Sequence, residues 1–99
     1  MGPGKAELLA RIDEAGSISA AGRAMGMSYK RAWSLVEEMN AAFARPVVDS
    51  SRGGRQGGGA VLTATGREVL ARFRRLERLL ETEGADEIAA LAALLKPAR

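Results

Sequence analysis

The chain has 99 residues, 46% of them hydrophobic, which is enough for one small domain and too few for two. It contains no cysteine and no histidine, so disulfides, zinc fingers and Cys or His nucleophiles are excluded. Lys and Arg outnumber Asp and Glu by 15 to 12, and a net charge of +3 permits a basic surface but excludes a polycationic tail.

The first helix is expected over residues 5–15. Residues 1–4 contain Pro3 and Gly4 and are expected to be frayed. Leu8, Leu9 and Ile12 recur at helical spacing and would face inward, and the following glycine would end the helix.

Residues 16–40 predict two short helices joined by a tight turn. Ser17 can cap the first helix, and Gly26 ends its apolar pattern. Ser28 can cap the second helix. Its apolar face steps by four, three and four residues along Ala32, Val36, Met39 and Phe43. Two such helices are typical of a helix-turn-helix, in which the first turns of the second helix enter the DNA major groove.

Three helices would close on one small core. The residues expected to be buried are Leu8, Leu9, Ile12, Ile18, Ala21, Met25, Ala32, Trp33, Val36 and Met39.

Gly22 lies in the middle of its helix, where glycine lowers helix stability by about 0.5–1 kcal/mol relative to Ala. A close approach of the two hinge helices, which requires a small residue, would offset this cost.

A β wing is expected after the third helix. Residues 45–46, Arg-Pro, would stop that helix, and residues 47–48 and 61–62 are short β-prone runs. Between them, SSRGGRQGGG predicts a hairpin tip that would lay Arg52 and Arg55 along a DNA backbone or into a minor groove. An anion cradle is the weaker interpretation, because no P-loop motif is present and no helix starts directly at the glycines.

The longest helical pattern covers residues 63–83, with Thr63 as its cap. Its apolar stripe, widened by Leu70 and Leu79, exceeds what a small core can cover from one side. The stripe could still pack on its own domain, but a dimer seam is the preferred interpretation. The predicted dimerisation residues are Val69, Phe73, Leu76 and Leu80. Gly84 would end this helix and Asp86 would cap a last amphipathic one.

The basic charge is concentrated around the hinge and the wing. Residues 23–59 carry six basic and three acidic side chains, which accounts for the whole net charge of +3. Polar and basic side chains gather at the start of the second hinge helix, as expected for contacts with bases and phosphates. These candidates are Tyr29, Lys30, Arg31 and Ser34. Ser17 and Ser19, at the start of the first hinge helix, are further candidates for phosphate contact.

Three stretches carry a family resemblance: GSISAAGRAMGMSYKRAW over residues 16–33, VEEMN over 36–40, and GGRQGGGAVLTATG over 53–66. They resemble the N-terminal winged-helix domain of ModE-type molybdate-responsive transcription regulators, which is similar to the DNA-binding domain of LysR-type regulators. The resemblance implies that the recognition helix faces DNA, that Arg52 and Arg55 lie in the wing, and that the helix from Thr63 dimerises. The recognition-helix residues it implies are Ser28, Tyr29, Lys30 and Ser34.

The sequence departs from this family in three places. The chain leaves no room for molybdate-binding domains, so direct oxyanion sensing is not expected, and a ligand would act through a separate sensing protein. Gly22 stands where Ala is usual, and the residues before Lys5 are too few for the family's first strand, which predicts a two-stranded wing.

The sequence therefore predicts a mainly α fold with a small β wing: a winged helix-turn-helix over residues 5–62 and a helical dimerisation segment over 63–99. The expected function is sequence-specific binding of double-stranded DNA by a homodimeric transcription regulator, without a metal or other cofactor. An enzyme is not expected, because the carboxylate pairs Asp13-Glu14 and Glu37-Glu38 are adjacent on helices and point in different directions. No apolar run approaches the roughly 18 residues of a membrane span, and the first residues lack the apolar core of a signal peptide, so a cytoplasmic location is expected. The alternatives are a winged-helix protein-interaction adaptor and an oxyanion sensor that uses the glycine loop.

Overall fold

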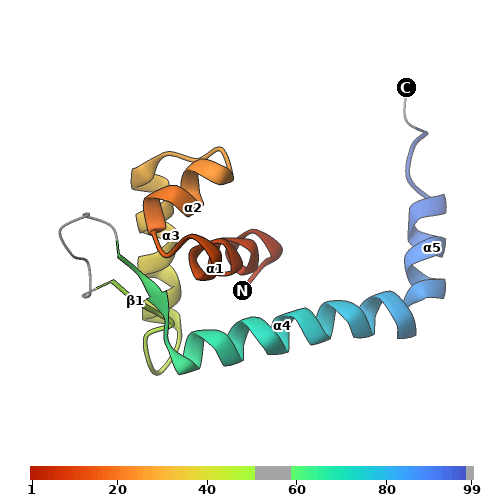
Figure 1. Cartoon of the computed structure of the whole chain (residues 1–99). Coiled ribbons are helices and arrows are strands. Elements are labelled where there is room, and N and C mark those ends of the chain that lie inside the picture. The colour runs from red at the N-terminus through yellow and green to blue at the C-terminus, as the bar shows by residue number, and fades with distance from the viewer. Residues whose placement is uncertain (51–58, 98–99) are drawn as a thin grey trace.

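A computed structural model describes residues 1–50 and 59–97. Within them, three helices pack together, a two-stranded sheet lies beside the third, and two further helices extend away (Figure 1). Arg52 and Arg55 lie outside the described residues. The elements are α1 (Pro3–Ala15), α2 (Ile18–Ala24), α3 (Tyr29–Ala42), β1 (Val48–Asp49), β2 (Val61–Leu62), α4 (Ala64–Glu83) and α5 (Ala85–Ala93).

Helix α1 begins earlier than the sequence predicts. Pro3 is its first residue, so the expected frayed start over residues 1–4 is wrong. Proline suits this position because its fixed φ is helical and its missing N–H would have no partner there in any case. The helix ends as expected at Gly16, which adopts a left-handed φ of 68° and donates its N–H to the carbonyl of Ile12 at 2.8 Å.

Helices α2 and α3 form the expected hinge unit and cross at Gly22. A Cβ built on Gly22 would lie 2.7 Å from the Cβ of Ala32, which is closer than two such carbons can approach. The predicted close approach of the two helices is therefore confirmed, and it explains why a glycine stands in the middle of α2. Met27 packs into the turn between the helices, against the core.

The hydrophobic core lies between α1, α2, α3 and the small sheet. Of the residues expected to be buried, Met25 and Trp33 are only half-buried at its edge, so that part of the expectation is wrong. The expected set missed Ala6 of α1, Leu35 of α3, and the residues in and beside the sheet. The buried hydrophobic residues are Ala6, Leu8, Leu9, Ile12, Ile18, Ala21, Ala32, Leu35, Val36, Met39, Val47, Val48, Ala60 and Leu62.

The strands pair antiparallel, with Val48 opposite Leu62 and Asp49 opposite Val61. The sheet formed by the described residues has two strands, as predicted. It is tied to the start of α2, because the N–H of Ala60 donates to the carbonyl of Gly16 at 3.0 Å. The wing strands are thereby fixed to the hinge unit.

Thr63 caps α4, as the sequence predicts. Its hydroxyl oxygen accepts from the N–H of Gly66 at 2.9 Å, and the same hydroxyl donates to the carbonyl of Pro46 at 2.7 Å. The expected cap at Asp86 is wrong, because α5 starts at Ala85 and Asp86 lies within its first turn. Gly84 allows α5 to begin at once in a new direction without a side-chain cap.

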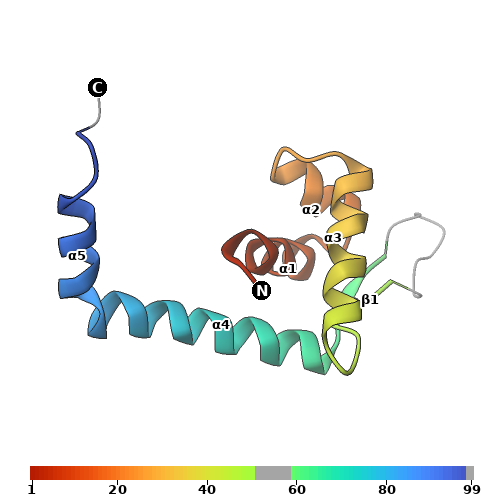
Figure 2. The ribbon, with the colours of Figure 1, turned by 180° about the vertical axis from the view of Figure 1, so that it is seen from behind.

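The molecule is elongated because α4 projects beyond the three-helix core and α5 turns away at its far end (Figures 1 and 2). The radius of gyration is 16.2 Å, whereas a compact chain of this length has about 13 Å. No residue of α5 is buried. Within the described residues, no helix is long and apolar enough to cross a membrane.

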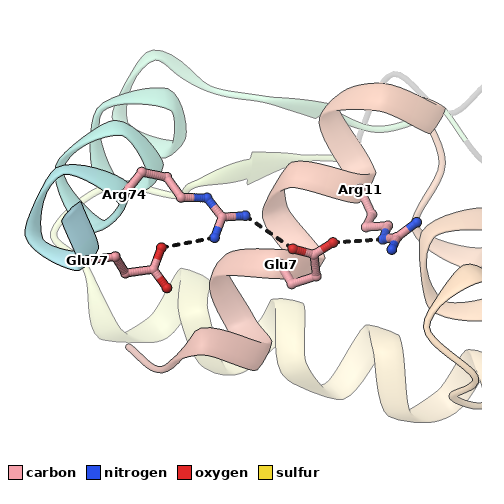
Figure 3. Close-up of polar contacts among 4 residues, drawn as sticks. All are labelled: Glu7, Arg11, Arg74 and Glu77. Atoms are coloured by element: carbon pink, nitrogen blue, oxygen red, sulfur yellow. Dashed lines mark hydrogen bonds and ion pairs between the residues drawn. The ribbon is translucent and has the colours of Figure 1, made fainter. Parts of the chain in front are cut away.

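Three connected ion pairs hold α4 against α1 (Figure 3). Glu7 pairs with Arg11 at 2.9 Å within α1 and with Arg74 at 3.2 Å across to α4, and Arg74 pairs with Glu77 at 3.1 Å. The hydrogen bonds of Arg74 to Glu77 and then to Glu7 raise the pKa of its guanidinium. The direction of α4 relative to the core is thus set by a polar contact as well as by packing.

Candidate nucleic-acid interface

The N-terminus of α3 is exposed and carries a side-chain cap. The hydroxyl of Ser28 accepts from the N–H of Arg31 at 3.0 Å, which satisfies one of the helix's free donors. The first turn of α3 contains two basic residues, Lys30 and Arg31, and no acidic residue. Two cations at the positive end of a helix dipole oppose helix stability by about 0.3–1 kcal/mol each. An anion bound there would reverse this cost.

Helix α3 has opposite buried and exposed faces. Ala32, Val36 and Met39 are buried on one side. Lys30 lies on the other side with the partly exposed Ser34 and the exposed Glu37, because positions three, four and seven residues apart share a helix face. The structure therefore brings Lys30 and Ser34 together on one outward surface, which we call the α3 outer face (Lys30, Ser34 and Glu37).

Tyr29 stands at the edge of this face, with 59% of its surface exposed. Its ring meets that of Trp33 edge-to-face, with centroids 6.1 Å apart and planes at 65°. Such a contact restricts the orientation of the tyrosine ring. Among the described residues the buried indole nitrogen of Trp33 has no hydrogen-bond partner, and the half-buried ring packs against the core.

Arg31 points away from Lys30. It lines a pocket of about 360 Å³ with Lys5 and Met27, between the starts of α1 and α3. Lys5 in turn pairs with Glu38 at 3.0 Å. The sequence grouped the two basic residues of the first turn together, but successive helical positions differ by about 100°, so they serve different surfaces.

The start of α2 holds the other two polar candidates. Ser17 uses its hydroxyl as the predicted cap, accepting from the N–H of Ala20 at 3.1 Å, and its oxygen lies 3.3 Å from that of Ser19. Both serines are partly exposed. Their hydroxyl groups are therefore held close together at a helix start, where backbone N–H groups favour an anion.

Asn40 is a positioning residue that sequence reasoning missed. Its side-chain oxygen accepts from the N–H groups of Val47 at 2.8 Å and Val48 at 3.1 Å, and its amide nitrogen donates to the carbonyl of Val48 at 3.3 Å. A single side chain thus pairs with the backbone at the start of β1 as a neighbouring strand would. The wing is fixed to the same helix that carries the α3 outer face.

The apolar stripe of α4 is divided between the core and the surface. Val69 and Leu70 are partly buried and pack against the core. Leu76 and Leu80 are 58% and 64% exposed, and Leu79 is 49% exposed. Within residues 1–50 and 59–97, no group of three or more His, Cys, Asp or Glu side chains could hold a metal ion.

Residues 4–67 match the family described as "Bacterial regulatory helix-turn-helix protein, lysR family". The chain belongs to this family. The match covers α1, the hinge unit and both wing strands, and ends inside α4. The family resemblance drawn from the sequence is therefore confirmed.

Relatives of this chain include a protein named for molybdenum and a DNA-binding regulator. The chain is 49% identical over 77 residues to the molybdenum-pterin-binding protein MopB of Rhodobacter capsulatus, a match that covers 78% of this chain and 28% of that protein. It is 38% identical over 77 residues to the DNA-binding transcriptional dual regulator ModE of Escherichia coli K12, covering 78% of this chain and 29% of that one. The chain thus spans less than a third of the length of either relative.

The fold also agrees with solved structures of lysR-family proteins. The DNA-binding domain of CbnR in complex with DNA has a TM-score of 0.69 and 23% sequence identity, with 92% of this chain and 99% of that one covered. At this identity the likeness shows the fold. It confirms the predicted fold class, a mainly helical winged helix-turn-helix.

Proposed function

We propose that this chain is a cytoplasmic transcription regulator, not an enzyme, that binds specific sites in double-stranded DNA as a homodimer. Residues 5–62 contact the DNA, and residues 63–99 form the dimer. The observation that carries the proposal is the start of α3, which combines a serine cap, an exposed polar face opposite the core, and two cations that make no ion pair with any described residue. The DNA complex of CbnR and the name of the ModE relative support it.

The α3 outer face enters the major groove. Lys30 donates to a guanine edge or a phosphate, and Ser34 and the hydroxyl of Tyr29 contact bases or the backbone beside it. Ser28 keeps its capping role and lies where the helix start meets a phosphate. Glu37 follows on the same face, and its carboxylate accepts from the amino group of a cytosine.

The other candidates contact the DNA backbone around α3. Arg31, on the flank towards α1, binds phosphate, and so do Ser17 and Ser19 at the start of α2. Arg52 and Arg55 contribute from the wing, as the sequence predicts. These contacts fix the register of the helix on the duplex without reading its sequence.

A homodimer accounts for the exposed stripe of α4, in which Val69, Phe73, Leu76 and Leu80 form the seam. The chain exposes 7022 Å², whereas a compact monomer of its 10.4 kDa exposes about 5,400 Å². A standard interface buries about 800 Å² on each partner, so the surplus is enough for one. Two-fold symmetry would present two copies of α3 to successive major-groove turns about 34 Å apart.

A mobility-shift series over increasing salt tests the DNA contact, using fragments selected from genomic DNA by the purified protein. We expect the affinity to fall steeply with salt. Lys30→Ala should remove specific binding and lower the salt slope by about one contact for each copy of the chain. Arg78→Ala, at an exposed position on α4, is the matched control and should leave binding unchanged. No shift on any fragment at low salt would refute DNA binding and favour the protein-interaction adaptor.

Sedimentation tests the dimer separately. Leu76→Asp places a charge in the middle of the stripe and should give monomers without unfolding the core, since this side chain is 58% exposed. Wild-type protein that sediments as a monomer would contradict the homodimer.

Molybdenum stands in the names of three relatives, two molybdenum-pterin-binding proteins and one molybdenum transport protein, which raises the question of a bound oxyanion. Titration calorimetry with molybdate, and with sulfate as the control, addresses it. We expect no heat from this chain and place any ligand response in a separate sensing protein. Binding of molybdate would favour the oxyanion sensor.

A further inference from the structure

The single tryptophan of the chain, Trp33, lies beside the α3 outer face. It follows Lys30 by three residues and precedes Glu37 by four, so its side chain is a neighbour of both on the helix surface. The ring is half-buried, because one part of it packs against the core and another part is open to solvent. An aromatic ring therefore contributes to the surface that is proposed to enter the major groove.

The exposed part of the Trp33 ring consists of carbon atoms. The one polar atom of this side chain, the indole nitrogen, is buried. The indole is therefore not placed to donate a hydrogen bond to a base edge or a phosphate, and it offers DNA an apolar edge. The methyl group that base pairs present in the major groove is the C5 methyl of thymine, which proteins recognise by apolar contact.

Tyr29 and the core restrict the Trp33 ring from two sides. The two rings meet edge-to-face with centroids 6.1 Å apart, and the buried part of the indole packs against core residues. Binding costs free energy when it immobilises a side chain that was free before. A ring that is already held loses little freedom when its exposed edge is covered, so even a small apolar contact can favour one base over another.

We infer that Trp33 recognises thymine, whose C5 methyl group packs against the exposed ring edge when α3 lies in the major groove. This inference rests on the proposed DNA binding and adds to it a preference for one thymine in each half-site. Lys30, Ser34 and Glu37 offer hydrogen-bonding groups, which suit the polar edges of bases. Trp33 supplies the apolar contact on the same surface, and a cytosine at that position would lack the methyl group that fills it.

Deoxyuridine substitution tests the inference on the unaltered protein, because uracil differs from thymine only in lacking the C5 methyl group. In a DNA fragment selected by the purified protein, each thymine is replaced in turn by uracil, and the affinity is measured by mobility shift. At one thymine of each half-site, we expect uracil to lower the affinity about fourfold, the effect of one buried carbon. At the other thymines we expect no change.

Two variants separate the ring contact from an effect of the methyl group on the DNA itself. Trp33→Leu keeps an apolar side chain against the core and removes the ring edge, so it should bind the thymine and uracil fragments equally. Tyr29→Phe keeps the ring beside Trp33 and removes the hydroxyl, and as the matched control it should retain the fourfold ratio. Thermal unfolding checks that both variants fold. If Trp33→Leu does not fold, Trp33→Met replaces it, since methionine adapts to irregular gaps in a core.

Fluorescence supplies a second measurement, because the emission of the single tryptophan reports on Trp33 alone. Binding of the thymine fragment should reduce the quenching of this emission by acrylamide, since the methyl group covers the exposed edge. Unchanged quenching would overturn the inference, as would a wild type that binds but tolerates uracil at every position, or an equal loss of affinity in Trp33→Leu. These results would leave the proposed function standing, whereas a protein that binds no fragment would overturn both.

Discussion

Gly66 sits in the first turn of α4, directly against the backbone at the start of β1. A Cβ built on it would lie 2.0 Å from the carbonyl oxygen of Val47 and 2.9 Å from its carbonyl carbon. Nothing in this contact can rotate away, since the neighbour is backbone. Gly66→Ala would therefore force the start of α4 away from β1.

The cost can be built from three terms. Overpacking against a fixed neighbour costs about 1–3 kcal/mol. The same displacement breaks the 3.0 Å bond from the N–H of Thr63 to the carbonyl of Val47, which adds about 0.5–1.5 kcal/mol. Alanine is more favourable than glycine inside a helix, which stabilises the variant by about 0.5–1 kcal/mol. The mid-values of these three terms give an expected net loss of about 2 kcal/mol, within outer limits of about 0.5–4 kcal/mol, or a melting temperature about 8–16 °C lower.

Thermal and urea unfolding followed by far-UV circular dichroism measure this change. Gly4→Ala is the matched control, because Gly4 also lies in the first turn of a helix but a Cβ there meets nothing within 4 Å. The control should be neutral or stabilised by up to about 1 kcal/mol. If Gly66→Ala were as stable as Gly4→Ala, the close approach of α4 to β1 would be refuted.

Three further changes test the contacts around α3. Gly22→Ala should destabilise the fold by about 1–2 kcal/mol because its Cβ meets that of Ala32. In a double-mutant cycle, Gly22→Ala should be neutral or stabilising when Ala32→Gly is already present. Purely additive effects on stability would contradict the contact. Asn40→Asp keeps the oxygen that accepts from Val47 and Val48 and loses the donor to the Val48 carbonyl. Urea unfolding should therefore show a smaller loss of stability than for Asn40→Ala. Equal losses of stability would contradict the role of the oxygen. Ser28→Ala removes the cap of α3 and should cost about 1 kcal/mol in the same assay, with an unchanged midpoint as the contrary result.

The helices and their boundaries followed well from the sequence, because caps and glycines act locally. Ser17, Ser28 and Thr63 each accept the backbone N–H that their position predicts. Asp86 failed as a cap because Gly84 let α5 start without one. In the same way Pro3 started α1 where a frayed end was expected.

Features that depend on long-range contact could not be predicted. Asn40 binds backbone seven and eight residues away, and only the fold reveals that β1 passes its side chain. The core contribution of Val47, Ala60 and Leu62 likewise follows from the sheet packing on α1 and α3, which helical periodicity does not describe. The close approach at Gly22 was predictable because a glycine inside a helix is itself an anomaly.

The ion pair between Glu7 and Arg74 fixes the rotation of α4 about its own axis relative to α1. Before Arg74 the helix is held by α1. After Arg74, the direction in which each side chain points depends only on its number of residues from Arg74. Each residue inserted or removed between Arg74 and Leu80 would turn the outer part of the stripe by about 100° and shift it by 1.5 Å. In the proposed homodimer, such a change in α4 would alter the angle between the two α3 helices, and so the half-site spacing that the dimer accepts, without any change in the residues proposed to touch DNA.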